Sequence, residues 1–294
     1  MQHPNLKDYE TWLNRRYRIN TIRSQLGVIH RFIQWCASEN INAGQCTYTE
    51  LIAYITYLSG KGLAKRTINL IITAIKNWFN YLIESGLREE NPAAELRIKN
   101  QGHKAAPDVI KYEDLENLYK LYAAGGIIGK RNKSILGLII YQGLSVRELQ
   151  ALELNDLKLE QGQIYVPGVG RSNDRILKLE AHQIVQLQNY VLHIRPVIIA
   201  MSAKETDKLF ITTGLSPILS NTLSKLMNQL KQIHPSVKNP QQLRASIIAH
   251  WYKLHNARQV QYMAGHRYVS STERYRTDKL ESLQEQLEKM HPTQ

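Results

Sequence analysis

The sequence has 294 residues, of which 43% are hydrophobic and 21% are charged. This composition is typical of a soluble globular protein, and the length favours two domains. No run of residues approaches the roughly 18 apolar residues that a membrane-spanning helix needs. The first residues, 1–8, lack the apolar core of a signal peptide. We therefore expect an intracellular, cytoplasmic protein that has no membrane partner.

The charge balance favours an acidic polymer as the partner. Lysine and arginine number 38 and aspartate and glutamate 25, which gives a net charge of +13. Nearly half of the excess lies in residues 1–106 and the rest beyond them. Neutralising phosphates releases counterions, so a basic surface spread over both parts of the chain predicts that both contact one nucleic acid. Charge alone does not distinguish this from a merely basic, soluble surface.

Several conspicuous side chains are expected in the core. Cys36 and Cys46 lack the spacing of metal ligands, so we interpret them as buried thiols. Trp12, Trp35 and Trp78 fall in segments with helical periodicity, where burial is commoner than base stacking. Clustered carboxylates with the spacing of a metal-dependent nuclease are not found in the sequence. We expect neither a metal nor a cofactor.

The first part of the chain indicates helices only. Apolar residues recur at helical spacing in Thr21–Cys36 and in Arg66–Ser85, and Thr47 is placed to cap a helix that runs to Leu58. Residues 1–96 are therefore expected to form an all-helical domain.

Three cations mark one helix start in this domain. Lys61, Lys65 and Arg66 stand together where backbone N–H groups and side-chain charge could meet one phosphate. They are candidate DNA-binding residues, and a solvated helix start explains them equally well.

Residues 97–110 indicate a linker, because they are polar, contain Gly102 and Pro107 and show no apolar period. Residues 111–294 are expected to form a second, α+β domain. Its expected elements are helices over Lys111–Gly125 and Lys130–Tyr141, a hairpin of Gln163–Pro167 and Arg175–Leu179, a helix from His182, a short strand over Lys208–Thr212, and helices through 216–290. The fold class is thus mainly α with a small β-sheet.

The C-terminal third carries three short segments that belong together. They are Pro240-Gln-Gln-Leu-Arg244, Ala264-Gly-His266 and Thr272-Glu-Arg-Tyr275. Their order and spacing resemble the active-site boxes of the tyrosine recombinase, or phage integrase, family, in its short Xer-like form. That family has His-x-x-Arg on a helix, then Gly-His, then a tyrosine nine residues after the histidine. The resemblance implies a helical, SAM-like core-binding domain that clamps DNA, joined to a mixed catalytic domain.

These residue types suit attack on a phosphodiester. A tyrosine hydroxyl, with an ordinary pKa of about 10, must lose its proton to act as a nucleophile. The attacked phosphate gains negative charge, which the planar, permanently charged fork of arginine stabilises. Tyr275 is the candidate nucleophile, Arg244 the candidate clamp and His266 a second donor. The resemblance implies a 3′-phosphotyrosyl intermediate, which conserves the bond energy without ATP or metal.

The first box departs from the family pattern. The family has Gly-Leu-Arg-x-x-Glu-Leu, whereas this chain has Gly143-Leu-Ser-Val-Arg-Glu-Leu149, with Ser145 at the arginine position. Ser145 and Glu148 have the spacing of a helix capping box, which explains the serine structurally. Arg147 lies about 200° around a helix from Ser145, so it does not replace the missing arginine from the same face. It remains a weaker candidate.

Two further positions depart from the pattern. The family's hairpin lysine, which protonates the leaving oxygen, is matched by Val169, which has no proton to donate. Arg171 and Arg175 lie in the same hairpin and are candidate electrostatic substitutes for this lysine, although arginine is a poor general acid. Either of them is also a candidate to take the role of the missing first-box arginine in a rebuilt clamp. Gln241 replaces the histidine of His-x-x-Arg; it donates a hydrogen bond but is no base.

The sequence therefore predicts a site-specific DNA recombinase or integrase, serving a mobile element or replicon. The alternatives are a catalytically weakened DNA-binding accessory protein on the same fold and a nicking–closing enzyme resembling type IB topoisomerases. The expected partners are double-stranded DNA and further copies of the chain, as dimers and tetramers on DNA, with no small-molecule substrate. Leu280, Leu283 and Leu287 form an apolar stripe that, by the resemblance, would link neighbouring protomers; packed on its own domain, the same stripe would be ordinary core.

Overall fold

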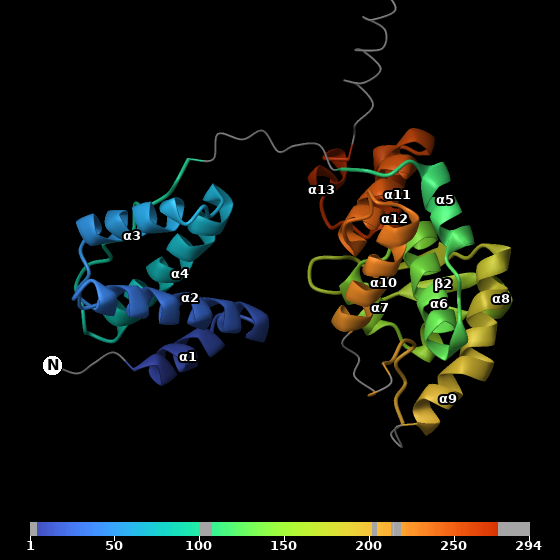
Figure 1. Ribbon diagram of the computed structural model, residues 1–294, viewed down its shortest axis with the longest axis horizontal. Coiled ribbons are helices and arrows are strands. Elements are labelled where there is room, and N and C mark those ends of the chain that lie inside the picture. The colour runs from blue at the N-terminus through green and yellow to red at the C-terminus, as the bar shows by residue number, and fades with distance from the viewer. Residues whose placement is uncertain (1–4, 100–107, 202–204, 213, 215–218, 276–294) are drawn as a thin grey trace, which may run out of the picture. The chain divides into compact units, whose positions relative to one another are not determined.

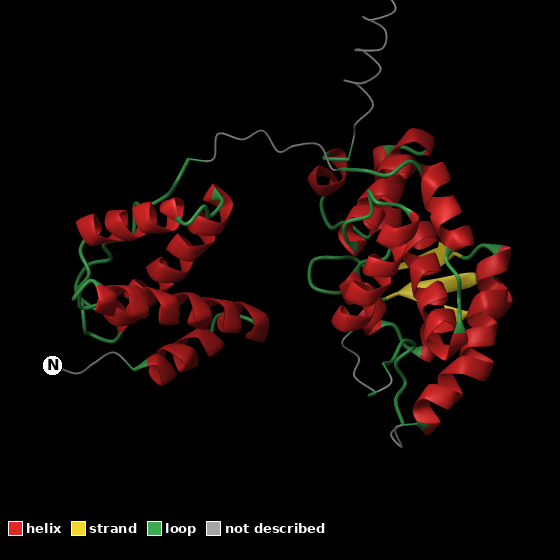
Figure 2. Cartoon of the chain, viewed as in Figure 1, coloured by secondary structure: helices red, strands yellow, loops and turns green. Residues whose placement is uncertain are grey.

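The computed structural model describes residues 5–99, 108–201, 205–212, 214 and 219–275. Contacts divide the chain into two compact units, residues 1–103 and 104–294, which are considered separately below. Figure 1 shows the element order, and Figure 2 shows that helices dominate both units and that the strands lie in the second.

The first unit is a bundle of helices. They are α1 (Leu6–Asn14), α2 (Ile19–Ser38), α3 (Tyr48–Gly60) and α4 (Lys65–Glu84). The predicted cap of α3 is confirmed, because Thr47 and Glu50 form a reciprocal capping box. Trp78 is fully buried, Trp35 is buried, and Trp12 is half-buried with its Nε1 donating to Glu84 over 2.8 Å.

The second unit combines helices with a small sheet. Its first elements are α5 (Tyr112–Leu121), α6 (Gly126–Gln142), α7 (Val146–Ala151), η1 (Leu154–Asp156), β1 (Leu157–Lys158), η2 (Leu159–Gln161), β2 (Gln163–Val166) and β3 (Arg175–Lys178). Then follow α8 (Ala181–Asn189), the π-helix η3 (Tyr190–Ile194), α9 (Arg195–Ala200), α10 (Ser220–Ile233), α11 (Pro240–Leu254), α12 (Ala257–Ala264) and α13 (Val269–Glu273).

The sheet fixes which face of β3 points inward. In the described residues it has three antiparallel strands in the order β1-β2-β3, with Val166 opposite Arg175 and Ile164 opposite Leu177. Side chains alternate between the two faces of a strand. Arg175 and Leu177 are therefore buried while Ile176 is exposed. This pleat sends an arginine into the interior of the unit.

The turn from α6 to α7 needs glycine. Gly143 has φ +60° at the end of α6, a left-handed conformation that side chains rarely adopt. A Cβ there would lie 2.9 Å from the Trp251 ring of α11. The chain then enters α7 at Ser145, so Gly143 sets both the turn and the close packing against α11.

The segment Lys208–Thr212 was predicted as a strand, and this prediction was wrong. Of these residues, only Lys208 forms a ladder contact, an isolated bridge with Glu153. Backbone carbonyls of this segment accept hydrogen bonds from side chains instead. The Tyr190 hydroxyl donates to the Leu209 carbonyl and the Arg131 guanidinium to the Ile211 carbonyl, both over 2.9 Å. The sequence pattern also missed β1 and the π-helix η3.

Candidate active site

Glu148 lies at the centre of a buried ionic cluster in the second unit. Its backbone N–H donates to Oγ of Ser145 over 3.3 Å, and its Oε2 accepts from the Ser145 N–H over 2.8 Å. These bonds form the predicted capping box and hold the carboxylate at the first turn of α7. Only 1% of the Glu148 side chain is exposed, so its charge requires partners inside the protein.

The first partner is Arg175, from the inward face of β3. Its Nη1 donates to Oε1 of Glu148 over 2.7 Å, and its Nε donates to the Met263 carbonyl over 2.8 Å. The side chain has no exposed surface, and Nη2 is buried with no hydrogen-bond partner among the described residues. The guanidinium thus ties β3 to α7 and to the end of α12.

The second partner is Arg244, from the middle of α11. Its Nη1 donates to Oε2 of Glu148 over 2.9 Å and also to the Gly143 carbonyl, while Nη2 donates to the Ala264 carbonyl over 2.6 Å. Its side chain is 7% exposed, which makes it the more accessible of the two arginines. One carboxylate therefore joins two guanidinium groups from elements far apart in the sequence.

This cluster carries a net positive charge. Burial by itself would raise the pKa of the Glu148 carboxyl, but Arg244 and Arg175 outweigh that effect and lower it. The carboxylate therefore stays ionised at neutral pH. Two guanidinium charges against one carboxylate leave one positive charge in a nearly dry site, which is the environment that favours an anion such as a phosphodiester.

The Gly-His turn after α12 packs directly on this cluster. Gly265 has φ +66°, and a Cβ there would overlap the Arg175 guanidinium. The tip of the hairpin is fastened to the same turn: Asn173 N–H donates to the Gly265 carbonyl over 2.9 Å, and Ser172 forms a bridge with His266. The glycine of the motif is thus required both for its backbone conformation and for the approach of Arg175.

His266 is held as a neutral ring. Its Nδ1 lies 2.8 Å from Oγ1 of Thr272, which is fully buried. Burial lowers the pKa of His266 to about 4, and the nearby charges of Arg244 and Arg175 act in the same direction. At neutral pH the ring therefore offers a hydrogen bond and adds no charge to the cluster.

Tyr275 lies against His266. The two rings are nearly parallel, with centroids 5.9 Å apart and planes 13° apart. The tyrosine is 8% exposed and packs with apolar residues of α11 and α12, and its N–H donates to the Thr272 carbonyl over 3.0 Å. The fold therefore assembles Arg175, Arg244, His266 and Tyr275 in one place.

Three predicted residues lie outside this cluster. Arg171 is exposed at the hairpin turn, Arg147 is exposed on α7, and Gln241 is exposed in the first turn of α11. The next residue, Gln242, is buried instead and has a structural role, since it accepts from the Lys238 N–H over 2.7 Å and donates to Asp108 over 3.2 Å. No contact of the three exposed side chains with Glu148 or His266 is seen in the described residues.

Sequence reasoning missed two site residues. Glu148 was interpreted only as a helix cap, although its place in the first box beside two candidate arginines signals an ionic partner. Thr272 was quoted within the tyrosine segment but given no role, and nothing in its spacing from His266 indicates their hydrogen bond. The described residues contain no group of three or more His, Cys, Asp or Glu side chains that could hold a metal ion.

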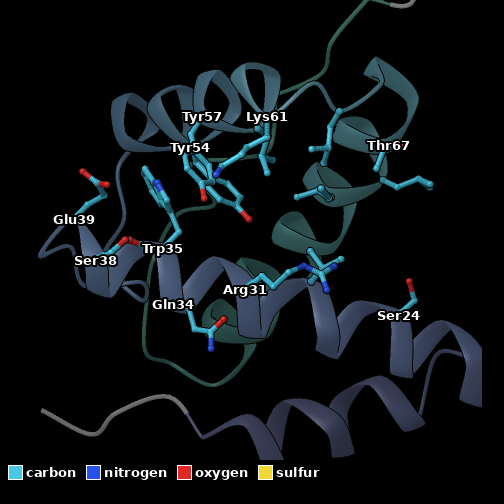
Figure 3. Close-up of a pocket in the computed structure, with 15 residues that line it drawn as sticks. Ser24, Arg31, Gln34, Trp35, Ser38, Glu39, Tyr54, Tyr57, Lys61 and Thr67 are labelled. Atoms are coloured by element: carbon cyan, nitrogen blue, oxygen red, sulfur yellow. The ribbon is translucent and has the colours of Figure 1, made fainter.

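The candidate DNA-binding cations of the first unit are exposed. Lys65 and Arg66 lie in the first turn of α4, as expected, but Lys61 follows the last residue of α3 and is not at this helix start. The Nζ of Lys61 lies 5.4 Å above the ring of Tyr57. Lys61 and Tyr57 line an open groove of about 810 Å³ between α2, α3 and α4. Figure 3 shows Arg31 on the opposite, α2 side of this groove. The groove is also lined by the aromatic side chains of Trp35, Tyr54 and Tyr57.

Two family models match the chain. "Phage integrase family" matches residues 108–281, and "Phage integrase, N-terminal SAM-like domain" matches residues 6–86. The chain belongs to the phage integrase family. None of the helices in the described residues is long and apolar enough to span a membrane.

Similar proteins span nearly the whole chain. Tyrosine recombinase XerC of Oceanobacillus iheyensis is 24% identical over 94% of this chain and 90% of its own. XerC of Bacillus subtilis is 25% identical, covering 95% and 93%. XerC of Shewanella sp. (strain MR-4) is 27% identical, covering 98% and 95%. The recognition of the family from its boxes is thus confirmed.

Solved structures show the same fold. XerH site-specific recombinase bound to palindromic difH substrate has a TM-score of 0.71 at 20% identity, covering 92% of this chain and 78% of that chain. The Tn1549 transposon integrase in complex with a circular intermediate DNA has a TM-score of 0.68 at 15% identity, covering 96% and 98%. These matches confirm the predicted fold class, a helical SAM-like domain plus a mixed catalytic domain.

Proposed function

We propose that this member of the phage integrase family cuts and rejoins duplex DNA at a specific site, with Tyr275 as the nucleophile. The observation that carries the proposal is the cluster in which Glu148 joins Arg175 to Arg244, with His266 and Tyr275 beside it. Attack of the Tyr275 hydroxyl on a phosphodiester forms a 3′-phosphotyrosyl bond and releases a 5′-hydroxyl. Rejoining reverses these steps, and in between the 3′ end of the cut strand stays covalently bound to Tyr275.

Arg175 supplies the positive charge that the missing arginine of the first box would have provided. Ser145 stands at the family's arginine position, and Arg175 brings a guanidinium to the carboxylate of the same box from β3. Arg244 is the less buried of the pair and contacts the phosphate together with His266. Arg175 supplies the second positive charge from behind, where low local polarity strengthens it.

Arg171 has a different role from Arg175. It is exposed at the hairpin turn, in the region where the family carries its lysine. Arginine keeps its proton at any physiological pH, so Arg171 acts on the leaving oxygen or the DNA backbone by charge alone. Protonation of the 5′-oxygen is then left to water, and a slower cleavage step than in lysine-bearing relatives is expected.

Both units bind DNA in this proposal. Lys61, Lys65 and Arg66 supply phosphate contacts from the first unit. Dimers on one site and tetramers across two sites are the proposed assemblies. The leucine stripe proposed to couple protomers, Leu280, Leu283 and Leu287, lies outside the described residues.

The test is capture of the covalent intermediate. Binding sites are first selected by the protein from a pool of random duplexes. Each selected site is then nicked a few nucleotides 3′ of successive phosphates, so that the short strand released by cleavage diffuses away. An SDS-resistant complex is expected for the wild-type chain and for Tyr268→Phe, an exposed tyrosine of the same segment, but not for Tyr275→Phe.

A non-catalytic accessory protein is the second candidate function. It is favoured by Ser145, which is fully accounted for as a helix cap, and by Val169, which has no proton to donate. Tight binding to the selected sites with no covalent complex from any nicked duplex would support this candidate and refute strand cleavage.

A further inference from the structure

Thr272 has one conspicuous polar contact. Its side chain is fully buried in α13, three residues before Tyr275. In the described residues, the hydroxyl makes its hydrogen bond with Nδ1 of His266, over 2.8 Å, and with no other group. A buried hydroxyl that failed to donate its hydrogen would lose about 1–3 kcal/mol, so Nδ1 is the acceptor that it uses.

Burial, and after it the charges around His266, keep the ring from carrying two protons. Arg244 and Arg175 oppose a further positive charge, as does Arg274 more weakly, and Glu148 alone favours it. A neutral imidazole has one N–H, and the hydrogen bond at one nitrogen decides which nitrogen carries it. If Nδ1 accepts from Thr272, the proton of the ring must be on Nε2.

We propose that Thr272 is a positioning residue that holds His266 as the Nε2–H tautomer, so that His266 donates to the phosphate and is not the base for Tyr275. This inference rests on the proposed cleavage function for its consequence, but the tautomer itself is independent of it. The same residue also fixes the approach of the nucleophile, because the Tyr275 N–H donates to the Thr272 carbonyl. One threonine therefore orients the donor through its side chain and the nucleophile through its backbone.

The pair Thr272→Val and Thr272→Ser separates the hydroxyl from the shape of the side chain. Valine keeps the branched shape and the backbone carbonyl but removes the hydroxyl, whereas serine keeps the hydroxyl. We expect Thr272→Val to slow covalent complex formation by about 10- to 100-fold, the usual scale for losing such an orienting partner. DNA affinity should not change, and Thr272→Ser should restore the rate.

The tautomer is read directly by NMR of ¹⁵N-histidine-labelled protein at pH 7. The wild-type chain and Thr272→Ser should show His266 with the proton on Nε2, and Thr272→Val should show a mixture of tautomers. His266→Gln assigns the signals. A wild-type ring protonated on Nδ1 would overturn the inference, even if Thr272→Val does not fold. So would a Thr272→Val variant that cleaves as fast as the wild type. Failure of every variant to cleave, with the Nε2–H tautomer intact, would instead refute the proposed function.

Discussion

The Arg175 guanidinium lies 2.7 Å from the Glu148 carboxylate, and both side chains are at most 1% exposed. The two residues come from the edge strand β3 and the short helix α7, and the bond joins the hairpin to the first box. Arg244 completes the cluster on the other carboxylate oxygen. Stability and catalysis are therefore expected to depend on the same three side chains.

Removing the central charge should destabilise the second unit strongly. Glu148→Gln leaves two buried guanidinium groups without a counter-charge, so we expect a loss of about 3–5 kcal/mol in the free energy of unfolding. Ser145→Ala removes only the cap on the same helix and should cost about 1 kcal/mol. Urea unfolding of the two variants measures the difference. Equal losses would mean that Glu148 contributes as a cap and not as the partner of the arginines.

Gly265 should be intolerant of a side chain for two separable reasons. Alanine there meets a positive φ and also the Arg175 guanidinium, whereas Gly126→Ala, at φ +61°, meets a positive φ with no atom within 4 Å of its Cβ. Gly126→Ala should cost about 1–2 kcal/mol from backbone strain. Gly265→Ala should cost clearly more in urea unfolding and should slow cleavage. If both variants lose the same stability, Arg175 does not pack on the turn as described.

The low pKa of His266 predicts a specific pH dependence of stability. Above pH 6.5 the ring is neutral in both folded and unfolded chains and contributes nothing. Between pH 6.5 and about 4 the unfolded chain takes up a proton that the folded chain excludes, so the wild type loses stability as the pH falls. Below about pH 4 this loss is complete.

The matched control for this effect is His266→Gln, which does not titrate. The melting temperature of the wild type should fall relative to that of His266→Gln between pH 6.5 and 4, and the difference should then level off. Parallel melting curves across this interval would show that His266 titrates normally in the folded protein.

The family's missing arginine offers a compensation test. If Arg175 replaces the charge absent at Ser145, then adding Ser145→Arg to Arg175→Ala should raise the cleavage rate at least about tenfold above that of Arg175→Ala alone. This gain is part of the effect expected for one transition-state donor. In the presence of Arg175, Ser145→Arg should bring no gain, because Glu148 already has two partners. Rates of covalent complex formation at saturating DNA provide the comparison. If Ser145→Lys restores the cleavage rate of Arg175→Ala as well as Ser145→Arg does, an arginine at position 145 does not take the role of Arg175 at the phosphate.

Local patterns predicted most of the helices because their causes are local. Thr47 and Ser145 begin helices through bonds to residues three positions along, and the hairpin expected over Gln163–Pro167 and Arg175–Leu179 is found as β2 and β3. The strand expected over Lys208–Thr212 failed because distant side chains, including that of Tyr190, occupy its carbonyls. No pattern within the segment carries that information.

The residue types of the candidate site were predictable from the sequence, but the contacts between these residues were not. The boxes predict Tyr275, Arg244 and His266 as site residues, since their residue types and spacing carry the family resemblance, and the structure brings these three together. Choosing between Arg171 and Arg175 required the pleat of β3 and the packing of the hairpin on Gly265. These are contacts between segments about 90 residues apart in the chain, beyond the reach of any local periodicity.

In the proposed mechanism Arg175 acts in the cleavage step and does not merely bind DNA. The most direct measurement is the rate of covalent complex formation on a nicked selected site at saturating protein, alongside the affinity for the same duplex. Arg175→Ala should lower the rate by about 10²-fold, an electrostatic loss as large as that of one oxyanion-hole donor, with affinity little changed. Arg171→Ala, at the exposed turn of the same hairpin, should affect the rate far less. An Arg175→Ala variant that cleaves at the wild-type rate, or that loses binding and cleavage equally, would contradict the claim.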